Sequence, residues 1–205
     1  AALGYKAIGL ADRAPVAALP AFLKAANHEG LAPIVGAEID LLLPVGSGRK
    51  ASRIEITSLL FARDSTGLSN VSALSSVAYA GWPALEAPVS WQVLESHSGG
   101  LALVLPVEAK SPLLDIAHAM LGELGHSLKQ FFGEAAFLGL TYSGLAEEKA
   151  LAGRTITLAE QMGLPIVALP HARFLKVEDA SSYAALRTAR EGAGWKSAGS
   201  QRSGV

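Results

Sequence analysis

Cysteine is absent from the 205 residues of this chain, and aromatic residues are scarce. Without cysteine the protein can form no disulfide, no thiolate metal site and no cysteine nucleophile. Aromatic residues make up 6% of a chain that is 50% hydrophobic, so alanine, leucine and valine must fill most of its core. The length suits one domain with a sizeable core.

Long hydrophobic runs are also missing, as no apolar stretch approaches the ~18 residues of a membrane span. The N-terminus shows no basic region followed by an apolar one, so we expect no signal peptide. These absences predict a cytoplasmic protein with no membrane partner. The 17 Lys and Arg residues against 18 Asp and Glu residues give a net charge of −1, which argues against a stand-alone nucleic-acid binder. This charge balance does not exclude that the chain is one domain of a larger DNA enzyme.

The usual nucleotide-binding and hydrolase motifs are absent from the sequence. It has no GxGxxG, no GxxxxGK[ST] and no GxSxG. The glycine-rich piece GSG at 46–48 is more simply a hairpin turn. Cofactor-binding loops are therefore not expected.

Short apolar strands alternate with helical periodicities along the chain. The predicted strands are 7–10, 32–43, 53–62, 101–105, 136–140 and 165–169. The predicted helices lie between Pro15 and Gly30, after Thr66, over 112–128, over 145–162 and over 178–190. The helix after Thr66 has one apolar face, formed by Leu68, Val71, Leu74 and Val77. The helix over 112–128 has Leu113, Ile116, Met120 and Leu124 in register. This order predicts an α/β fold with a largely parallel sheet, open or closed into a barrel.

Three polar residues stand on or just after predicted strands: Asp12, Glu38 and His171. Side chains at strand ends can converge at one mouth of an α/β barrel, where such folds place their active sites. Each residue taken alone is better explained by a cap or a salt bridge. The other histidines are expected to be structural or exposed; they are His28, His97, His118 and His126.

Two stretches carry a specific resemblance to one known family: LGYKAIGLADR at 3–13 and AFLKAANHEGLAPIVGAEIDL at 21–41. They resemble the N-terminal PHP (polymerase and histidinol phosphatase) domain of bacterial DNA polymerase III alpha subunits. The resemblance continues in order through 59–74, 90–105 and 147–186, and so runs from about residue 3 to 191. It implies a distorted (β/α)7 barrel over residues 3–191, which we expect to be N-terminally incomplete and to lack its first strand. Residues 192–205, rich in Gly and Ser, would be a flexible tail.

Active members of the family gather His, Asp, Glu and sometimes Cys around metal ions that activate water against phosphate esters or 3′ DNA ends. At the matching positions, Asp12 and Glu38 keep an acid, but Arg13 replaces a histidine. His171 stands where the family has Asp, and Arg173 stands where it has His.

Other family positions have also lost their ligands. A first HxH motif would precede residue 1, Thr57 stands near an expected histidine, and Leu105 and Pro106 occupy the Cys-bearing motif. Arginine has no lone pair for a metal, and a unit charge ~5 Å from a dication costs roughly 6–7 kcal/mol at an effective dielectric near 20. The sequence therefore predicts remnant, empty metal positions at Asp12, Glu38 and His171, and no catalytic residue.

The two arginines suggest what replaced the metal. We expect Arg13 and Arg173 to neutralise Asp12 and Glu38 by charge-assisted hydrogen bonds. No cofactor is then expected, with Mn, Zn or Mg bound only if the site is intact.

The resemblance implies a structural part of a DNA-directed DNA polymerase, a nucleotidyltransferase of DNA replication, that docks the proofreading exonuclease subunit and the rest of the polymerase and meets DNA only indirectly. Whether this chain is itself an enzyme stays open. The alternatives are a metal-dependent phosphoesterase or 3′–5′ exonuclease of the family, and a fragment of the error-prone polymerase branch. An open barrel edge also predicts self-association.

Overall fold

The computed structural model describes residues 4–13, 18–46, 51–80, 87–141, 146–169 and 176–190. The chain divides into two units, Ala1–Leu169 and Pro170–Val205. The first contains every described strand. The predicted tail at 192–205 lies outside the described residues, and the domain limits 3–191 stay a prediction.

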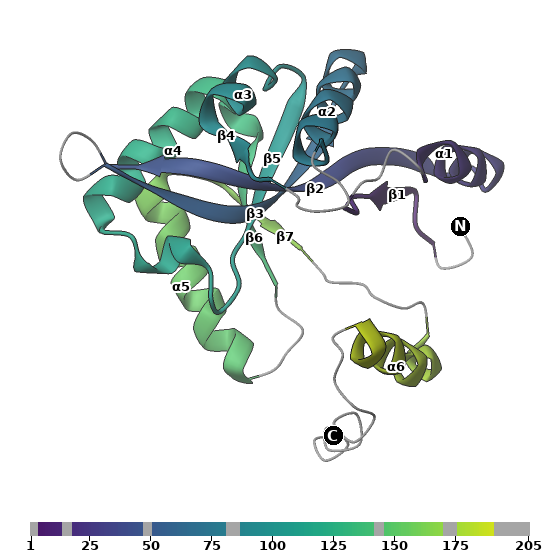
Figure 1. Cartoon of the computed structure of the whole chain (residues 1–205). Helices are drawn as coiled ribbons and strands as arrows, with labels where there is room; N and C mark the ends of the chain where they lie inside the picture. The colour runs from purple at the N-terminus through teal and green to yellow at the C-terminus, as the bar shows by residue number, and fades with distance from the viewer. Residues whose placement is uncertain are drawn as a thin grey trace. The chain divides into compact units, whose positions relative to one another are not determined.

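The described strands of the first unit form one seven-stranded, curled sheet of the half-barrel type (Figure 1). The strands are β1 (Ala7–Leu10), β2 (Ala32–Val45), β3 (Ser52–Ala62), β4 (Val89–Ser90), β5 (Leu101–Pro106), β6 (Ala136–Leu140) and β7 (Ile166–Ala168). Their order is β1-β2-β3-β5-β6-β7, with β4 paired to β2. The predicted α/β class is confirmed.

Strand direction departs from the sequence-based prediction. β3 runs antiparallel to both β2 and β5, whereas the other pairs are parallel. Residues 47 and 48 of the predicted turn lie outside the described residues, but only residues 46–51 connect β2 to β3, and so short a connection joins antiparallel neighbours. Gly46 enters it with a φ of 72°, which favours glycine. The sheet is therefore mixed rather than largely parallel.

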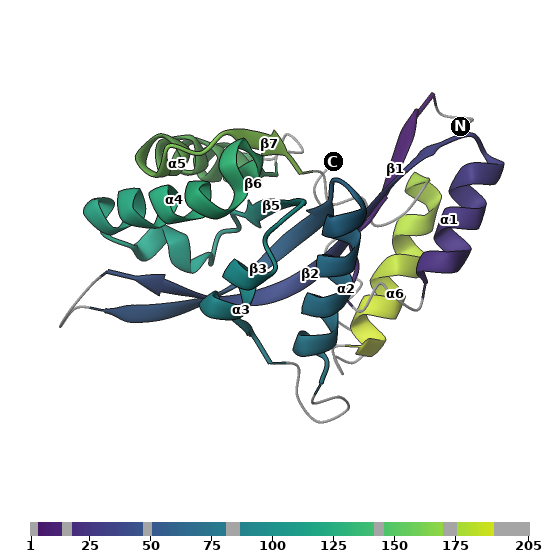
Figure 2. The ribbon, with the colours of Figure 1, turned by 90° about the horizontal axis from the view of Figure 1, so that it is seen from above.

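Helices follow the strands along the first unit. They are α1 (Leu19–His28), α2 (Ser65–Ala78), α3 (Trp91–Ser96), the short η3 (Pro112–Asp115), α4 (His118–Phe132), the short η4 (Gly133–Ala135) and α5 (Ala146–Met162). Figure 2 shows α4 and α5 side by side. The second unit contains η5 (Val177–Asp179) and α6 (Ala180–Arg190). Among the described helices, none is both long and apolar enough to cross a membrane.

The core lies on one face of the β2–β3 hairpin. Alternate residues of β2, among them Ile39 and Leu41, are buried there against α2 and α4. Because successive side chains of a strand point to opposite faces, the residues between them lie on the other face of the sheet. Those residues include Glu38 and Asp40, so the core alternation alone places both carboxylates on one side.

The predictions for two helices were wrong in detail. Leu68 and Val77 of α2 are 36% and 43% exposed, while Val71 and Leu74 are buried as expected. The helix predicted over 112–128 is interrupted, because Ile116 and Ala117 take extended conformations between η3 and α4. The elements β4 and α3 were not predicted, since a two-residue strand and a six-residue helix are too short to show a period.

Strands β1 and β7 stand at the two ends of the strand order, and each has an exposed apolar side chain. Ile8 on β1 is 45% exposed, and Ile166 on β7 is 38% exposed. Among the described residues no pairing joins β1 to β7. Open apolar edges are suited to pairing with another chain, and self-association stays a prediction.

Candidate functional site

Two carboxylates lie side by side on the face of β2 that is turned away from the helical core. Glu38 and Asp40 are two residues apart, on the side opposite the buried Ile39. Their side chains are 31% and 20% exposed. The antiparallel register places Thr57 of β3 directly opposite Asp40. Both acids are thus only partly shielded from water, and they need partners.

Arg13 reaches these carboxylates because β1 runs parallel to β2. The register pairs Leu10 with Val35. Beyond the end of β1, the amide of Glu38 donates a hydrogen bond to the carbonyl of Asp12 at 3.1 Å. This extra contact continues the pairing past the strand and sets Arg13 beside the face of β2 that carries the two carboxylates.

The Arg13 guanidinium binds both acids at once. Its Nε donates to Glu38 Oε1 at 2.7 Å. Its two terminal nitrogens donate to the two oxygens of Asp40 at 3.0 and 3.1 Å. Such a bidentate, charge-assisted pair is among the stronger hydrogen-bonding arrangements in proteins. One arginine therefore ties the end of β1 to the middle of β2.

Thr57 completes the cluster, since its hydroxyl donates to Asp40 Oδ1 at 2.6 Å. Burial by itself would raise the pKa of the Asp40 carboxyl. The hydrogen bonds from Arg13 and Thr57, with the charge of Arg13, outweigh burial and hold that pKa below its ordinary value. Asp40 therefore stays ionised to a lower pH than an ordinary aspartate. We call Arg13, Glu38, Asp40 and Thr57 the arginine cluster.

The arginine cluster should make stability sensitive to acid. The pKa of Asp40 is lower in the folded than in the unfolded chain, so its contribution is fully present above the unfolded value of about 3.9 and is lost as the pH falls through the folded value. We expect wild type to lose free energy of unfolding below about pH 4 more steeply than Asp40→Asn. Urea denaturation at a series of pH values measures this, and parallel curves for the two proteins would contradict it.

The residues predicted from the sequence are only partly brought together. Arg13 contacts Glu38 as expected, but its second described partner is Asp40 rather than Asp12. Asp12 is exposed, and its side chain makes no hydrogen bond or ion pair with the residues the structure describes. His171 and Arg173 lie outside the described residues.

Sequence reasoning missed Asp40 and Thr57. The signal for Asp40 was present, since it follows Glu38 by two positions in an alternating strand and must share its face. Thr57 was noted only as a position that had lost a histidine. Its role depends on the β2–β3 register, which the turn and the core pattern fix together.

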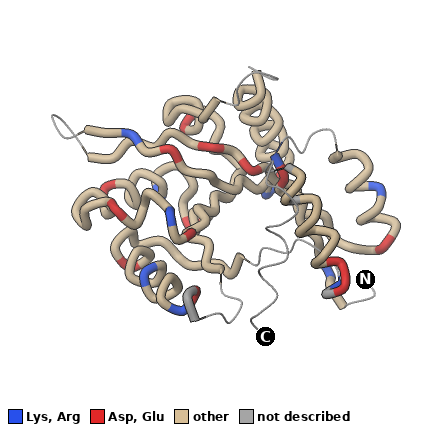
Figure 3. Tube along the Cα trace, turned by 60° about the horizontal axis from the view of Figure 1, so that its bottom comes forward, with Lys and Arg blue, Asp and Glu red and all other residues tan. Residues whose placement is uncertain are grey.

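The described residues do not fit a metal ion. Among them, no three His, Asp or Glu side chains are grouped so as to hold one. At the arginine cluster, oxygens of both carboxylates already accept hydrogen bonds from a cation that cannot itself ligate a metal. Figure 3 also shows acidic and basic residues interspersed along the described trace, without a long basic stretch.

Comparison with known proteins gives the chain its relatives. DNA polymerase III subunit alpha of Aquifex aeolicus is 26% identical over 197 residues, covering 89% of this chain and 17% of the relative. The same subunit of Escherichia coli is 29% identical over 184 residues, covering 87% and 15%. The chain thus spans about one sixth of the length of these curated relatives.

Two further comparisons concern the fold and the family. A crystal structure of an assigned metal-dependent phosphoesterase from Bifidobacterium adolescentis superposes with a TM-score of 0.47 at 13% identity, covering 82% of this chain and 77% of that one. That likeness is too distant to add to the assignment. The family model described as PHP domain matches residues 1–138, well over half of the sequence. The chain belongs to the PHP domain family.

Proposed function

We propose that this chain is a non-catalytic PHP module of a DNA polymerase III alpha subunit, serving DNA replication in the cytoplasm. The observation that supports it most directly is the bond of Arg13 to both Glu38 and Asp40. The relatives named DNA polymerase III subunit alpha supply the polymerase context. In this proposal an ion-pair cluster does the structural work of a metal centre.

The physical argument rests on charge and lone pairs. A divalent ion at the cluster would have to take carboxylate oxygens from Arg13 and then sit close to its positive charge. At ~5 Å and an effective dielectric near 20, that repulsion is about 6–7 kcal/mol. The two carboxylates would attract the ion, but only by giving up their hydrogen bonds with Arg13, and the Thr57 hydroxyl is a neutral ligand. The same arginine, by contrast, satisfies both acids and holds β1 against β2.

The proposed role is that of a support and a docking part. It would brace the remainder of the polymerase and bind the proofreading exonuclease subunit, with DNA contacted only indirectly. The interspersed charges of the described residues favour contact with proteins over contact with a phosphate backbone. Co-purification of the chain with that exonuclease subunit tests the docking part, and its absence with a well-folded chain would contradict it.

The metal prediction is tested on the whole chain. After dialysis against Mn, Zn or Mg salts, elemental analysis should find substoichiometric metal in wild type. Arg13→His should bind Zn or Mn more tightly, because a neutral imidazole offers a lone pair and both carboxylates are released. The matched control is Arg13→His combined with Asp40→Asn, which should lose most of that gain.

A different result would contradict the proposal. Stoichiometric Mn or Zn in wild type, with a metal-dependent phosphodiesterase activity that Asp12→Asn abolishes, would replace this proposal by the phosphoesterase or exonuclease alternative. A folded wild type without metal and without activity, alongside a metal-binding Arg13→His, supports the non-catalytic module.

A further inference from the structure

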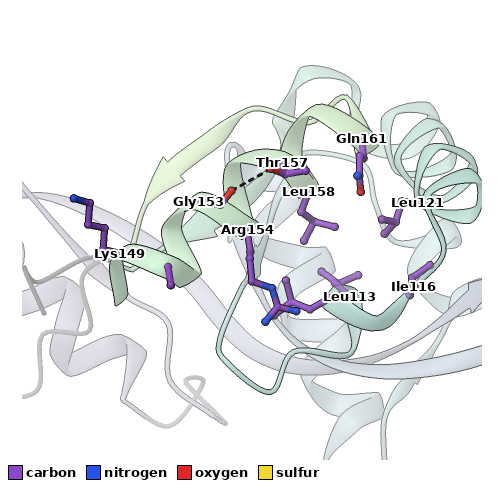
Figure 4. Close-up of a pocket in the computed structure, with 11 residues that line it drawn as sticks. Leu113, Ile116, Leu121, Lys149, Gly153, Arg154, Thr157, Leu158 and Gln161 are labelled. Carbon is purple, nitrogen blue, oxygen red and sulfur yellow. Dashed lines mark hydrogen bonds between the residues drawn. The ribbon is translucent and has the colours of Figure 1, made fainter. Parts of the chain in front are cut away.

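A groove of about 590 Å³ lies between η3, the start of α4 and α5 (Figure 4). Its floor is made by Leu113, Leu121 and Leu158, which are buried. Leu114 and Ile116 add a half-buried apolar wall. These elements differ from those that carry the arginine cluster, so the groove is a separate feature of the first unit.

On the α5 side, the groove is lined partly by residues with small side chains. Ala150 and Gly153 both line the groove and are exposed. They are three residues apart and thus share one face of the helix. A Cβ added at Gly153 would meet no atom within 4 Å. The Thr157 hydroxyl turns back to donate to the Gly153 carbonyl at 3.2 Å (Figure 4). Another chain could therefore lie closely against α5.

Two cations flank this apolar floor. Lys149 and Arg154 line the groove and are exposed. Among the described residues neither forms an ion pair, and no carboxylate lines the groove. A ligand that fits must therefore bring apolar groups for the floor and negative charge for the rim.

We propose that the groove binds a short segment of a partner protein in which apolar side chains are flanked by carboxylates. Leucines of the partner would pack on Leu114 and Ile116, which line the groove and keep accessible apolar surface, and its acids would pair with Lys149 and Arg154. A nucleic-acid backbone suits the rim but would set its charged phosphates against the apolar wall of Leu114 and Ile116, which is costly without compensating bonds. This inference does not depend on the polymerase role.

The test uses the full chain and two fluorescent peptides, one of leucines flanked by glutamates and one with lysines in place of the glutamates. Fluorescence anisotropy should show binding of the glutamate peptide only. Lys149→Glu with Arg154→Glu should weaken it roughly tenfold or more. The matched control is Lys24→Glu, a charge reversal at an exposed cation of α1, which should leave binding unchanged.

Gly153→Leu separates loss of the groove from loss of the fold. The added side chain should fill the groove and abolish peptide binding. It should also leave the melting temperature unchanged or raise it, because leucine has a higher helix propensity than glycine. The proposal is overturned if the wild-type chain does not bind the glutamate peptide, binds both peptides with the same affinity, or binds a single-stranded oligonucleotide more tightly. It is also overturned if the Gly153→Leu variant binds the glutamate peptide as tightly as wild type does.

Discussion

Replacing Arg13 with alanine is expected to lower the free energy of unfolding at pH 7 by about 2–3 kcal/mol. The substitution leaves Glu38 and Asp40 with like charges on one strand face and without the cation that bonds to both of them. Exposed pairs contribute about 0–1 kcal/mol, and breaking a fully buried pair costs about 3–5 kcal/mol. These carboxylates are 31% and 20% exposed, so the effect falls between the two limits. Denaturant midpoints at constant pH measure it.

The control for Arg13 is a double-mutant cycle. In a background carrying Glu38→Gln and Asp40→Asn, the same replacement should cost less than about 1 kcal/mol, since no charge is left unpaired. Arg53→Ala, at an exposed arginine of β3, should change stability by less than about 0.5 kcal/mol. Equal losses for Arg13→Ala in both backgrounds would show that the ion pairs do not stabilise the fold.

Gly125→Ala is expected to lower the free energy of unfolding by about 3 kcal/mol, although it adds only one methyl group. Gly125 is on α4, where that helix packs against the end of α5. A Cβ at this position would lie 2.7 Å from the carbonyl carbon of Met162 and 2.9 Å from its Cα. A backbone atom cannot rotate away as a side chain can, so the two helices would have to separate. Thermal or urea unfolding measures the loss.

Gly122→Ala provides a control on the same helix, one turn away. Its Cβ would come no closer than 3.7 Å to the carbonyl oxygen of Gln161, which is an ordinary contact. Alanine should then stabilise α4 by up to about 1 kcal/mol through helix propensity. The two substitutions thus have opposite expected signs. Similar effects from both would mean that α4 and α5 do not approach as closely as the structure shows.

The α4–α5 contact also matters for the groove, because η3, α4 and α5 together form its walls. Moving α5 outward at Met162 would shift Leu158 and Gly153 with it. The close approach at Gly125 is therefore part of what gives the groove its width.

Much of the fold followed from short-range patterns. The strands β2 and β3 and the helices α1 and α5 lie within a few residues of their predicted bounds. Period, turn glycines and helix-ending residues depend on neighbours along the chain, which the sequence displays directly. The face of α2 and the break before α4 were missed, because the packing of distant elements decides which apolar residues are buried.

The sequence by itself determined the family, the α/β class and the replacement of a histidine by Arg13, since these depend only on residue identity and order. Only the tertiary structure decided which acids Arg13 binds. Asp40 and Thr57 join it, and the Asp12 side chain does not, because the registers of β1, β2 and β3 bring together residues that are far apart in the chain. The groove at α5 has the same origin, as its floor and its rim come from separate segments that meet only when the helices pack.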